Sequence, residues 1–251
     1  MVHTIIAPKP IMQNLSDAIV LDEEREQLHR QMLSSVSHDL KTPLASIIGA
    51  LEVFDRMKDK LPEEKKLALT QVALQEAYRL DNFITNILDM ARFENSFVKP
   101  REERSEIRAI LNDCLLRLSN RMQGVTINIE TGEPIEILTD PVLLTRAICL
   151  VLDNAVKFGG MPPVITIKCA RKDDQSAVIT IHDNGAGIPL ELREKIFSKY
   201  TRFVREDQQN AGTGLGLAIT RIIMRLLRGG IDATNHSEGG ACFILTVPLP
   251  K

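Results

Sequence analysis

Tryptophan is absent from this 251-residue chain, which has only two tyrosines and eight phenylalanines. Aromatic side chains are the usual platforms for stacking nucleic-acid bases, so their scarcity argues against a base-stacking surface. An excess of positive charge is missing as well, because the formal net charge is −2. We therefore expect neither nucleic acid nor an anionic membrane surface to be the main partner.

Long apolar runs are also missing. The longest, such as residues 148–152, are far shorter than the roughly 20 residues that span a bilayer. Residues 1–10 have neither the basic flank nor the apolar core of a signal peptide. The sequence therefore predicts no membrane span and no secretion signal within this chain.

The chain has no C-x-x-C pair, and its four cysteines are widely spaced. A zinc site is therefore not expected. Cys149 lies in an apolar helical pattern and Cys242 in a strand pattern, and the other two are Cys114 and Cys169. This usage is typical of reduced cysteines in or near the core of a cytosolic protein.

Apolar residues with helical spacing begin near residue 15 and continue to about residue 58. Pro43 interrupts this pattern and predicts a local kink. A turn with Pro62 and a second helical pattern follow, so the sequence predicts an antiparallel hairpin of two long helices over residues 14–95. The apolar positions are Leu21, Leu28, Met32, Val36, Leu40, Leu44, Ile47, Leu51 and Phe54, then Leu67, Val72, Leu74, Ala77, Leu80, Ile84, Ile87, Leu88 and Ala91.

A two-helix hairpin cannot cover its own apolar seam. Two hairpins paired as a four-helix bundle would cover it, which predicts a homodimer through this region. The alternative is that the seam packs against the rest of the same chain.

Helices and strands alternate after the hairpin. Residues 1–13 and 96–104 are predicted to be a flexible tail and a linker, and residues 105–251 a second domain. Asp140 and Pro141 have the residue types of an N-cap and a first helical position. The expected elements are helices at 105–121, 140–158 and 215–227, and strands at 125–130, 135–138, 164–170, 177–183, 231–235 and 241–247. This order predicts an α/β sandwich, with one sheet covered by a helical layer.

The run from Ser37 to Leu44 contains the first candidate site. His38 lies beside Asp39 on the first predicted helix, and a neutral imidazole is a nucleophile whose proton a neighbouring carboxylate can accept. Thr42 lies one turn further along the same face. A lone histidine–aspartate pair on a helix is more often a solvated surface, so the assignment depends on motifs downstream.

The second motif ends the helix at Phe158. Asn154 and Lys157 are three residues apart and therefore lie on one helix face. Oxygen ligands and phosphate groups are what Mg²⁺ prefers, so this face suits a metal–phosphate site. Taken alone, each residue is more often part of a polar helix surface.

Two glycine-rich motifs follow. Asp183 ends a predicted strand ahead of Gly185 and Gly187, and these glycines would let backbone approach a nucleotide closely or form a simple hairpin turn. The run from Gly212 to Leu217 opens a helix, whose N-terminal N–H groups suit a phosphate. It is neither a Walker A motif nor a dinucleotide-binding fingerprint.

In this order the four motifs resemble the sequence boxes of the sensor histidine kinases, and residues 154–160 are most similar to KdpD-type members. The resemblance covers about residues 22–250. It implies a helical dimerisation and phosphotransfer hairpin, a four-helix bundle in the dimer, followed by a Bergerat-type α/β sandwich ATPase domain. It also implies that His38 takes a phosphoryl group from ATP and passes it to an aspartate of a response regulator receiver domain.

The resemblance assigns a role to each motif. Asn154 would hold Mg²⁺ against the ATP phosphates, and Leu150 stands where the family often has another asparagine, so Asn154 would be the only metal ligand. Lys157 would contact phosphate and Asp183 the adenine amino group. The remaining ATP-binding positions are Phe158, Gly185, Gly187, Ile188, Tyr200, Arg202, Gly212, Thr213, Gly214, Leu215, Gly216 and Leu217.

The hairpin has two further assignments. Thr42 would orient water for dephosphorylation of the regulator, or instead bond the backbone beside Pro43. Ala45, Gly49 and Ala50 leave room for a docking helix of the regulator, or instead let the bundle helices pack closely.

Two other classes remain open. One is an ATP-driven clamp of the chaperone or mismatch-repair type, which would lack the His-Asp-x-x-Thr-Pro hairpin. The other is a pseudokinase scaffold that only dimerises and dephosphorylates, against which the intact Asn154, Lys157 and Asp183 argue. A cytoplasmic core of a longer sensor is expected, with any membrane anchor lying upstream.

Overall fold

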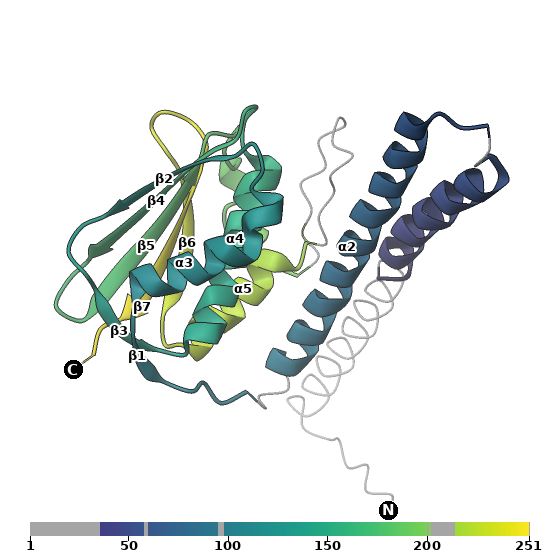
Figure 1. Ribbon diagram of the computed structural model, residues 1–251. Coiled ribbons are helices and arrows are strands. Elements are labelled where there is room, and N and C mark those ends of the chain that lie inside the picture. Colours follow the sequence, from purple (N-terminus) through teal and green to yellow (C-terminus); the bar gives the residue numbers. More distant parts are fainter. Residues whose placement is uncertain (1–35, 58–59, 95–97, 200, 202–213, 251) are drawn as a thin grey trace, which may run out of the picture. The chain divides into compact units, whose positions relative to one another are not determined.

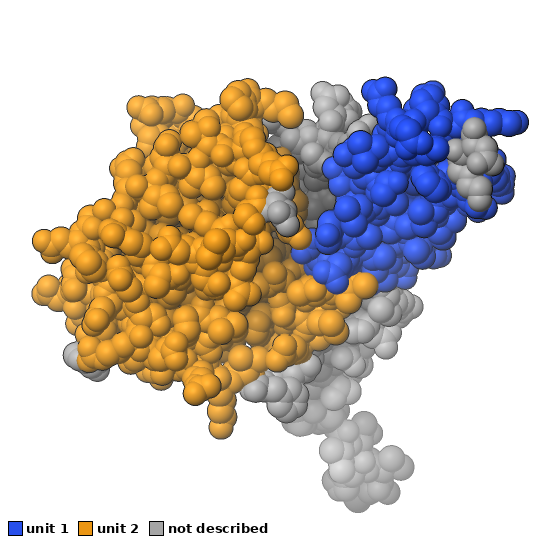
Figure 2. Space-filling view, in the orientation of Figure 1, with its two compact units in different colours: residues 1–83 blue, residues 84–251 orange. Residues whose placement is uncertain are grey.

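The computed structural model describes residues 36–57, 60–94, 98–199, 201 and 214–250. It separates into two compact units, residues 1–83 and 84–251, which Figure 2 colours differently. The long helix α2 (Glu63–Glu94) crosses the boundary between them. All the strands that the structure describes belong to the second unit.

The described part of the first unit is a helical hairpin. Residues 36–57 are helical throughout, so the helix continues through Pro43. The backbone N–H of Lys65 donates to the carbonyl oxygen of Pro62 at 2.9 Å where α2 begins. Figure 1 shows the two helices folded back on one another, which confirms the predicted hairpin fold. Leu21, Leu28 and Met32 of the predicted seam lie outside the described residues.

The buried stripe of α2 differs from the predicted one. Phe83, Asn86, Met90 and Phe93 are buried at helical spacing, although the sequence pattern had passed over them. Many predicted seam positions are instead exposed in the single chain. These exposed positions are Leu44, Leu51, Leu67, Val72, Leu74, Ile84 and Leu88.

The second unit is built on a five-stranded sheet with the order β2-β4-β5-β7-β6. β2 and β4 are parallel, and the other neighbouring pairs are antiparallel. Alternate residues of the central strands are fully buried, as a sheet with one covered face requires. The strands are β2 (Thr126–Thr131), β4 (Val164–Arg171), β5 (Ser176–Asp183), β6 (Gly230–Asn235) and β7 (Ala241–Pro248).

Three helices cover one face of this sheet (Figure 1): α3 (Ile107–Leu118), α4 (Pro141–Phe158) and α5 (Gly216–Leu226). Asp140 caps α4 as predicted, because its Oδ1 accepts from the N–H groups of Val142 and Leu143, each at 3.1 Å. The arrangement confirms the predicted α/β sandwich. None of the helices in the described ranges is long and apolar enough to cross a membrane.

A second, two-stranded sheet was not predicted. β1 (Glu103–Glu106) pairs antiparallel with β3 (Glu136–Thr139), and Ser105 lies opposite Ile137. Residues 103–104 therefore form part of a strand rather than a linker, and the helix begins at Ile107 rather than at residue 105. β1 is short and polar, so its sequence has no alternating apolar pattern that would predict a strand.

Candidate functional site

His38 presents its imidazole to solvent from the helix of the first unit. Its side chain is 79% exposed, while that of the neighbouring Asp39 is only 14% exposed. Nδ1 of His38 lies 3.6 Å from Oδ1 of Asp39, slightly beyond hydrogen-bond distance. The geometry therefore offers an accessible nucleophile with a carboxylate close to one of its ring nitrogens.

Thr42 makes a local contact one turn beyond His38. Its Oγ1 donates to the carbonyl oxygen of His38 at 3.1 Å. This is the backbone bond that the sequence left open as the alternative for Thr42. Because the side chain is exposed, rotation about one bond would free the hydroxyl, and a role toward water stays a prediction.

The C-terminal part of α4 carries Asn154 and Lys157, the residues predicted to bind Mg²⁺ and the ATP phosphates. Leu150 is buried, as expected for the apolar stripe, and Asn154 is partly exposed. Lys157 Nζ donates to Asp153 Oδ2 at 2.6 Å, and Asp153 Oδ1 accepts from Arg121 NH1 at 3.3 Å. Asp153, which the sequence analysis had not singled out, therefore forms an ion pair with Lys157, one helical turn further along α4.

Asp183 is a buried carboxylate at the end of β5, with 3% of its surface exposed. Burial raises its pKa, and this effect is partly offset by two N–H groups that donate to Oδ1, from Gly185 at 2.9 Å and Ala241 at 3.1 Å. The two backbone hydrogen bonds to Oδ1 fix the orientation of the carboxylate. It is suited to accept a hydrogen bond from a ligand.

The turn after Asp183 explains its glycines. A Cβ at Gly185 would collide with the carbonyl of Phe158, so the ends of β5 and α4 are in direct contact. Gly187 has φ +74°, in the left-handed region that favours glycine. Ile188 is held on both backbone groups by Asn235, whose Oδ1 accepts from its N–H at 2.8 Å and whose Nδ2 donates to its carbonyl at 2.9 Å.

Asn184 fastens a neighbouring loop. Its Oδ1 accepts from the N–H groups of Gly160 and Val164, each at 2.9 Å, and its Nδ2 donates to the carbonyl of Pro162 at 2.9 Å. The loop after α4 is thereby tied to the end of β5. Asn184 lies inside a motif that the sequence had singled out, whereas nothing in the sequence around Asn235 pointed to Ile188.

The last motif is described only in part. Tyr200, Arg202, Gly212 and Thr213 lie outside the described residues. Gly214 has φ +66°, and Leu215 is fully buried at the N-cap of α5. Gly216 and Leu217 open α5, where Thr220 Oγ1 donates to the Gly216 carbonyl at 2.9 Å.

The described parts of three motifs therefore meet in the second unit. The end of α4 meets the turn after β5 at Phe158 and Gly185, and the start of α5 lies near α4, because a Cβ at Gly216 would meet Leu150 Cδ2 at 3.7 Å. His38 belongs to the other unit. The described residues include no group of three or more His, Cys, Asp or Glu side chains that could hold a metal ion.

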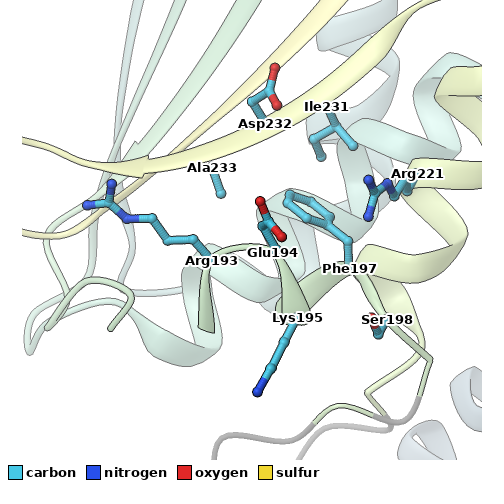
Figure 3. Close-up of a pocket in the computed structure, with 9 residues that line it drawn as sticks. All are labelled: Arg193, Glu194, Lys195, Phe197, Ser198, Arg221, Ile231, Asp232 and Ala233. Atoms are coloured by element: carbon cyan, nitrogen blue, oxygen red, sulfur yellow. The ribbon is translucent and has the colours of Figure 1, made fainter. Parts of the chain in front are cut away.

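A cavity of about 550 Å³ lies elsewhere in the second unit (Figure 3). Its lining comes from residues 193–195, Phe197 and Ser198, from Arg221 of α5 and from residues 231–233 of β6. Arg221 is stacked over Phe197, with its guanidinium carbon 5.5 Å from the ring centroid. None of the predicted nucleotide residues lines this cavity.

Two family models match the chain. A model described as the His Kinase A (phospho-acceptor) domain matches residues 28–96. A model described as the histidine kinase-, DNA gyrase B- and HSP90-like ATPase matches residues 139–251. Every predicted site residue falls within one of the two matched segments.

Two curated relatives resemble nearly the whole chain. The sensor protein KdpD of Escherichia coli is 33% identical over 228 residues, which are 90% of this chain and 25% of that protein. The adaptive-response sensory kinase SasA of a Synechococcus species (strain JA-3-3Ab) is 29% identical over 257 residues, 97% of this chain and 68% of that protein. The chain thus spans about a quarter of the length of KdpD.

A solved structure has the same fold. The histidine kinase ThkA, in complex with the response regulator protein TrrA, is 24% identical to this chain, with a TM-score of 0.67. The match covers 91% of this chain and 64% of that one.

Proposed function

Because the chain belongs to the sensor histidine kinases of two-component systems, we propose that it transfers the γ-phosphoryl group of ATP to His38. The observation that carries the proposal is the accessibility of the His38 side chain, 79% exposed within the segment matched by the phospho-acceptor model. As one ring nitrogen attacks phosphorus, Asp39 accepts or stabilises the proton on the other. The ATPase domain supplies the remaining requirements, which are position and charge neutralisation.

ATP would be held at both of its ends by the second unit. The buried carboxylate of Asp183 accepts a hydrogen bond from the adenine amino group, while its two backbone donors keep it in place. Asn154 would supply an oxygen ligand for Mg²⁺, and Lys157 would contact a phosphate after leaving Asp153. Mg²⁺, when bound, neutralises charge on the transferred phosphate.

The hairpin selects the kinase over an ATP-driven clamp. The matched ATPase model also includes proteins like DNA gyrase B and HSP90, so it does not separate these classes. The separate match of residues 28–96 to a phospho-acceptor domain does separate them. The intact Asn154, Lys157 and Asp183 argue against a scaffold without kinase activity.

We infer that a response regulator receives the phosphoryl group on an aspartate. ThkA, a protein of the same fold, was solved with a response regulator bound. Thr42 would assist a separate reaction, the dephosphorylation of the regulator, by orienting a water molecule toward its phosphorylated aspartate. A cytoplasmic location, where ATP and receiver domains are found, is consistent with these reactions.

We also infer a homodimer through the hairpin. Exposed apolar side chains from both helices lie on the single chain: Leu44, Ile48, Leu51, Val53 and Met57, with Leu67, Val72, Leu74 and Tyr78. Apolar surface on this scale is costly in water. A second hairpin, completing a four-helix bundle, would cover it.

The test is incubation of the purified chain with γ-labelled ATP and Mg²⁺. We expect label on the protein that is lost in acid and retained in base, as for phosphohistidine. Omission of Mg²⁺ should abolish the label. A base-labile, acid-stable label would indicate phosphoserine or a similar ester, and would contradict the proposal.

A further inference from the structure

Two cysteines that are far apart in the sequence meet between α3 and α4. The Sγ atoms of Cys114 and Cys149 lie 2.6 Å apart, although 35 residues separate the two positions. Both are free thiols. A disulfide has an S–S length of about 2.05 Å, so the sulfurs need to approach by only about half an ångström. The two helices pack against each other, so the fold holds both sulfurs at the same interface.

The two thiols differ in access. Cys114 has no exposed surface, whereas Cys149 is partly exposed. Small oxidants therefore reach Cys149 first, and Cys114 is the nearest group that can react with the product. This is the arrangement of an attacking and a resolving cysteine.

The local charges favour reaction at Cys149. A hydrogen bond from the Cys114 thiol lowers the pKa of Cys149, and the guanidinium groups of Arg117 and Arg146 lower it further, against the opposing effect of burial. The same hydrogen bond, together with burial, raises the pKa of Cys114. Because the thiolate is the reactive form, Cys149 is the nucleophile of the pair.

We propose that Cys114 and Cys149 form a reversible disulfide on exposure to a hydroperoxide, and that this bond fastens α3 to α4 in the ATPase domain. The Cys149 thiolate attacks one peroxide oxygen, the O–O bond breaks, and hydroxide leaves to give a sulfenic acid. This hydroxide takes up the proton that the Cys149 thiol released when it ionised, which gives the first water. The Cys114 sulfur then attacks the Cys149 sulfur, the S–O bond breaks, and the departing hydroxide takes the Cys114 proton. Two thiols and one hydrogen peroxide thus yield one disulfide and two waters.

The disulfide would join α3 to α4, the helix that carries the residues predicted to bind the ATP phosphates. Cys149 precedes Asn154 on α4, and Arg121, just beyond α3, binds Asp153 on α4 at 3.3 Å. Without the disulfide, α3 and α4 are held together by side-chain packing and by this ion pair, and the disulfide adds a covalent link between them. Because the sulfurs move so little, we expect higher stability and unchanged ATP affinity. Disulfides in the cytosol are mostly transient or redox-sensing, and a dithiol reductant should reverse this one.

The two other cysteines of the chain are internal controls. Burial raises the pKa of Cys169 to about 11, and it also raises the pKa of Cys242. Both are buried, and neither has another thiol among its described hydrogen-bond partners. They should therefore remain free under conditions that join Cys114 and Cys149.

The experiment treats the folded, reduced chain with hydrogen peroxide, blocks remaining thiols with iodoacetamide, and maps peptides without a reductant. The expected result is a linked Cys114–Cys149 peptide, with Cys169 and Cys242 alkylated. The thermal midpoint should rise by about 10 °C, as expected for closing a loop of this length in a domain of this size, and dithiothreitol should reverse the rise. Cys149→Ser and Cys114→Ser should each remove it.

Alkylated Cys114 after complete reaction, or a first crosslink through Cys169 or Cys242, would overturn the proposal. The peptide map uses the unaltered chain, so a variant that folds poorly leaves this test intact. The result is also independent of kinase activity, because it is read from thiols and from stability rather than from phosphate transfer.

Discussion

At the scale of single residues, Asp183 is a carboxylate whose burial opposes its charge. Burial raises its pKa above the ordinary value of 3.8, despite the N–H groups of Gly185 and Ala241. In the pH range from 3.8 up to its folded pKa, the folded chain therefore binds more protons at this site than the unfolded chain. The contribution of Asp183 to the free energy of unfolding must fall as pH rises through this range.

Asp183→Asn should separate nucleotide binding from folding. The amide oxygen still accepts from both backbone N–H groups and the side chain carries no charge to desolvate, but an NH2 donor replaces the second carboxylate oxygen, so the adenine amino group loses its acceptor. We expect the free energy of ATP binding to weaken by about 1–3 kcal/mol. The free energy of unfolding at neutral pH should not fall, and the part of its pH dependence that comes from Asp183 should disappear. Calorimetric titration measures ATP affinity, and denaturant unfolding at several pH values measures stability. Asp174→Asn, at an exposed carboxylate, is the control and should change neither. Unchanged ATP affinity would count against the adenine role.

At the scale of elements, the first hairpin helix places three small residues, which the sequence analysis had grouped together, in two different environments. Ala45 and Gly49 are exposed, whereas Ala50 is buried at 8% exposure. Ala50 therefore contributes to packing within the hairpin, as in the second of the two roles considered for the small residues. Ala45 remains available for a docking partner.

Ala45→Arg should slow transfer to the receiver aspartate and leave labelling of His38 unchanged, because only the bimolecular step meets this exposed position. Ala50→Arg is the matched comparison. It places a charge in a buried site, so it should reduce helicity and both reactions together. Transfer kinetics with a purified receiver domain and circular dichroism measure the difference. Normal transfer by Ala45→Arg would remove this position from the docking surface.

Elements with strong local signals were predictable, and elements that depend on distant partners were not. α4 was predicted to its first residue because Asp140 and Pro141 mark its start. β1 was missed because it forms a strand by pairing with β3, 30 to 36 residues away, and its own polar sequence has no strand pattern. The buried stripe of α2 at Phe83, Met90 and Phe93 was missed because apolar residues occur on several faces of that helix.

The same distinction applies to the site. Short patterns were enough to propose the motif residues Asn154, Asp183 and Gly185, whose roles stay predictions. Their neighbours Asn184 and Asp153 could have been proposed by asking which residues hold each motif in place. Asn235 lies 47 residues from Ile188, and its contact depends on the fold of β6. No local pattern contains that information.

At the scale of the whole molecule, Leu51→Asp should weaken the dimer. Leu51 is 54% exposed in the single chain, so the substitution should remove few contacts within one hairpin. Its cost should appear where a second copy would bury the new charge. We expect sedimentation velocity to show a shift toward monomer with helicity retained, and Glu52→Gln, at an exposed neighbour, to leave the dimer intact. A dimer of undiminished strength would place the interface elsewhere.

The central claim is that His38 receives the phosphoryl group, and His38→Gln tests it most directly. Labelling with γ-labelled ATP and Mg²⁺ should disappear in this variant, while ATP affinity stays at the level of the unaltered chain, because Asp183 and Asn154 are untouched. His236→Gln, at a histidine stacked on His182 in the second unit, should still label. Acid-labile label that persists in His38→Gln would contradict the account.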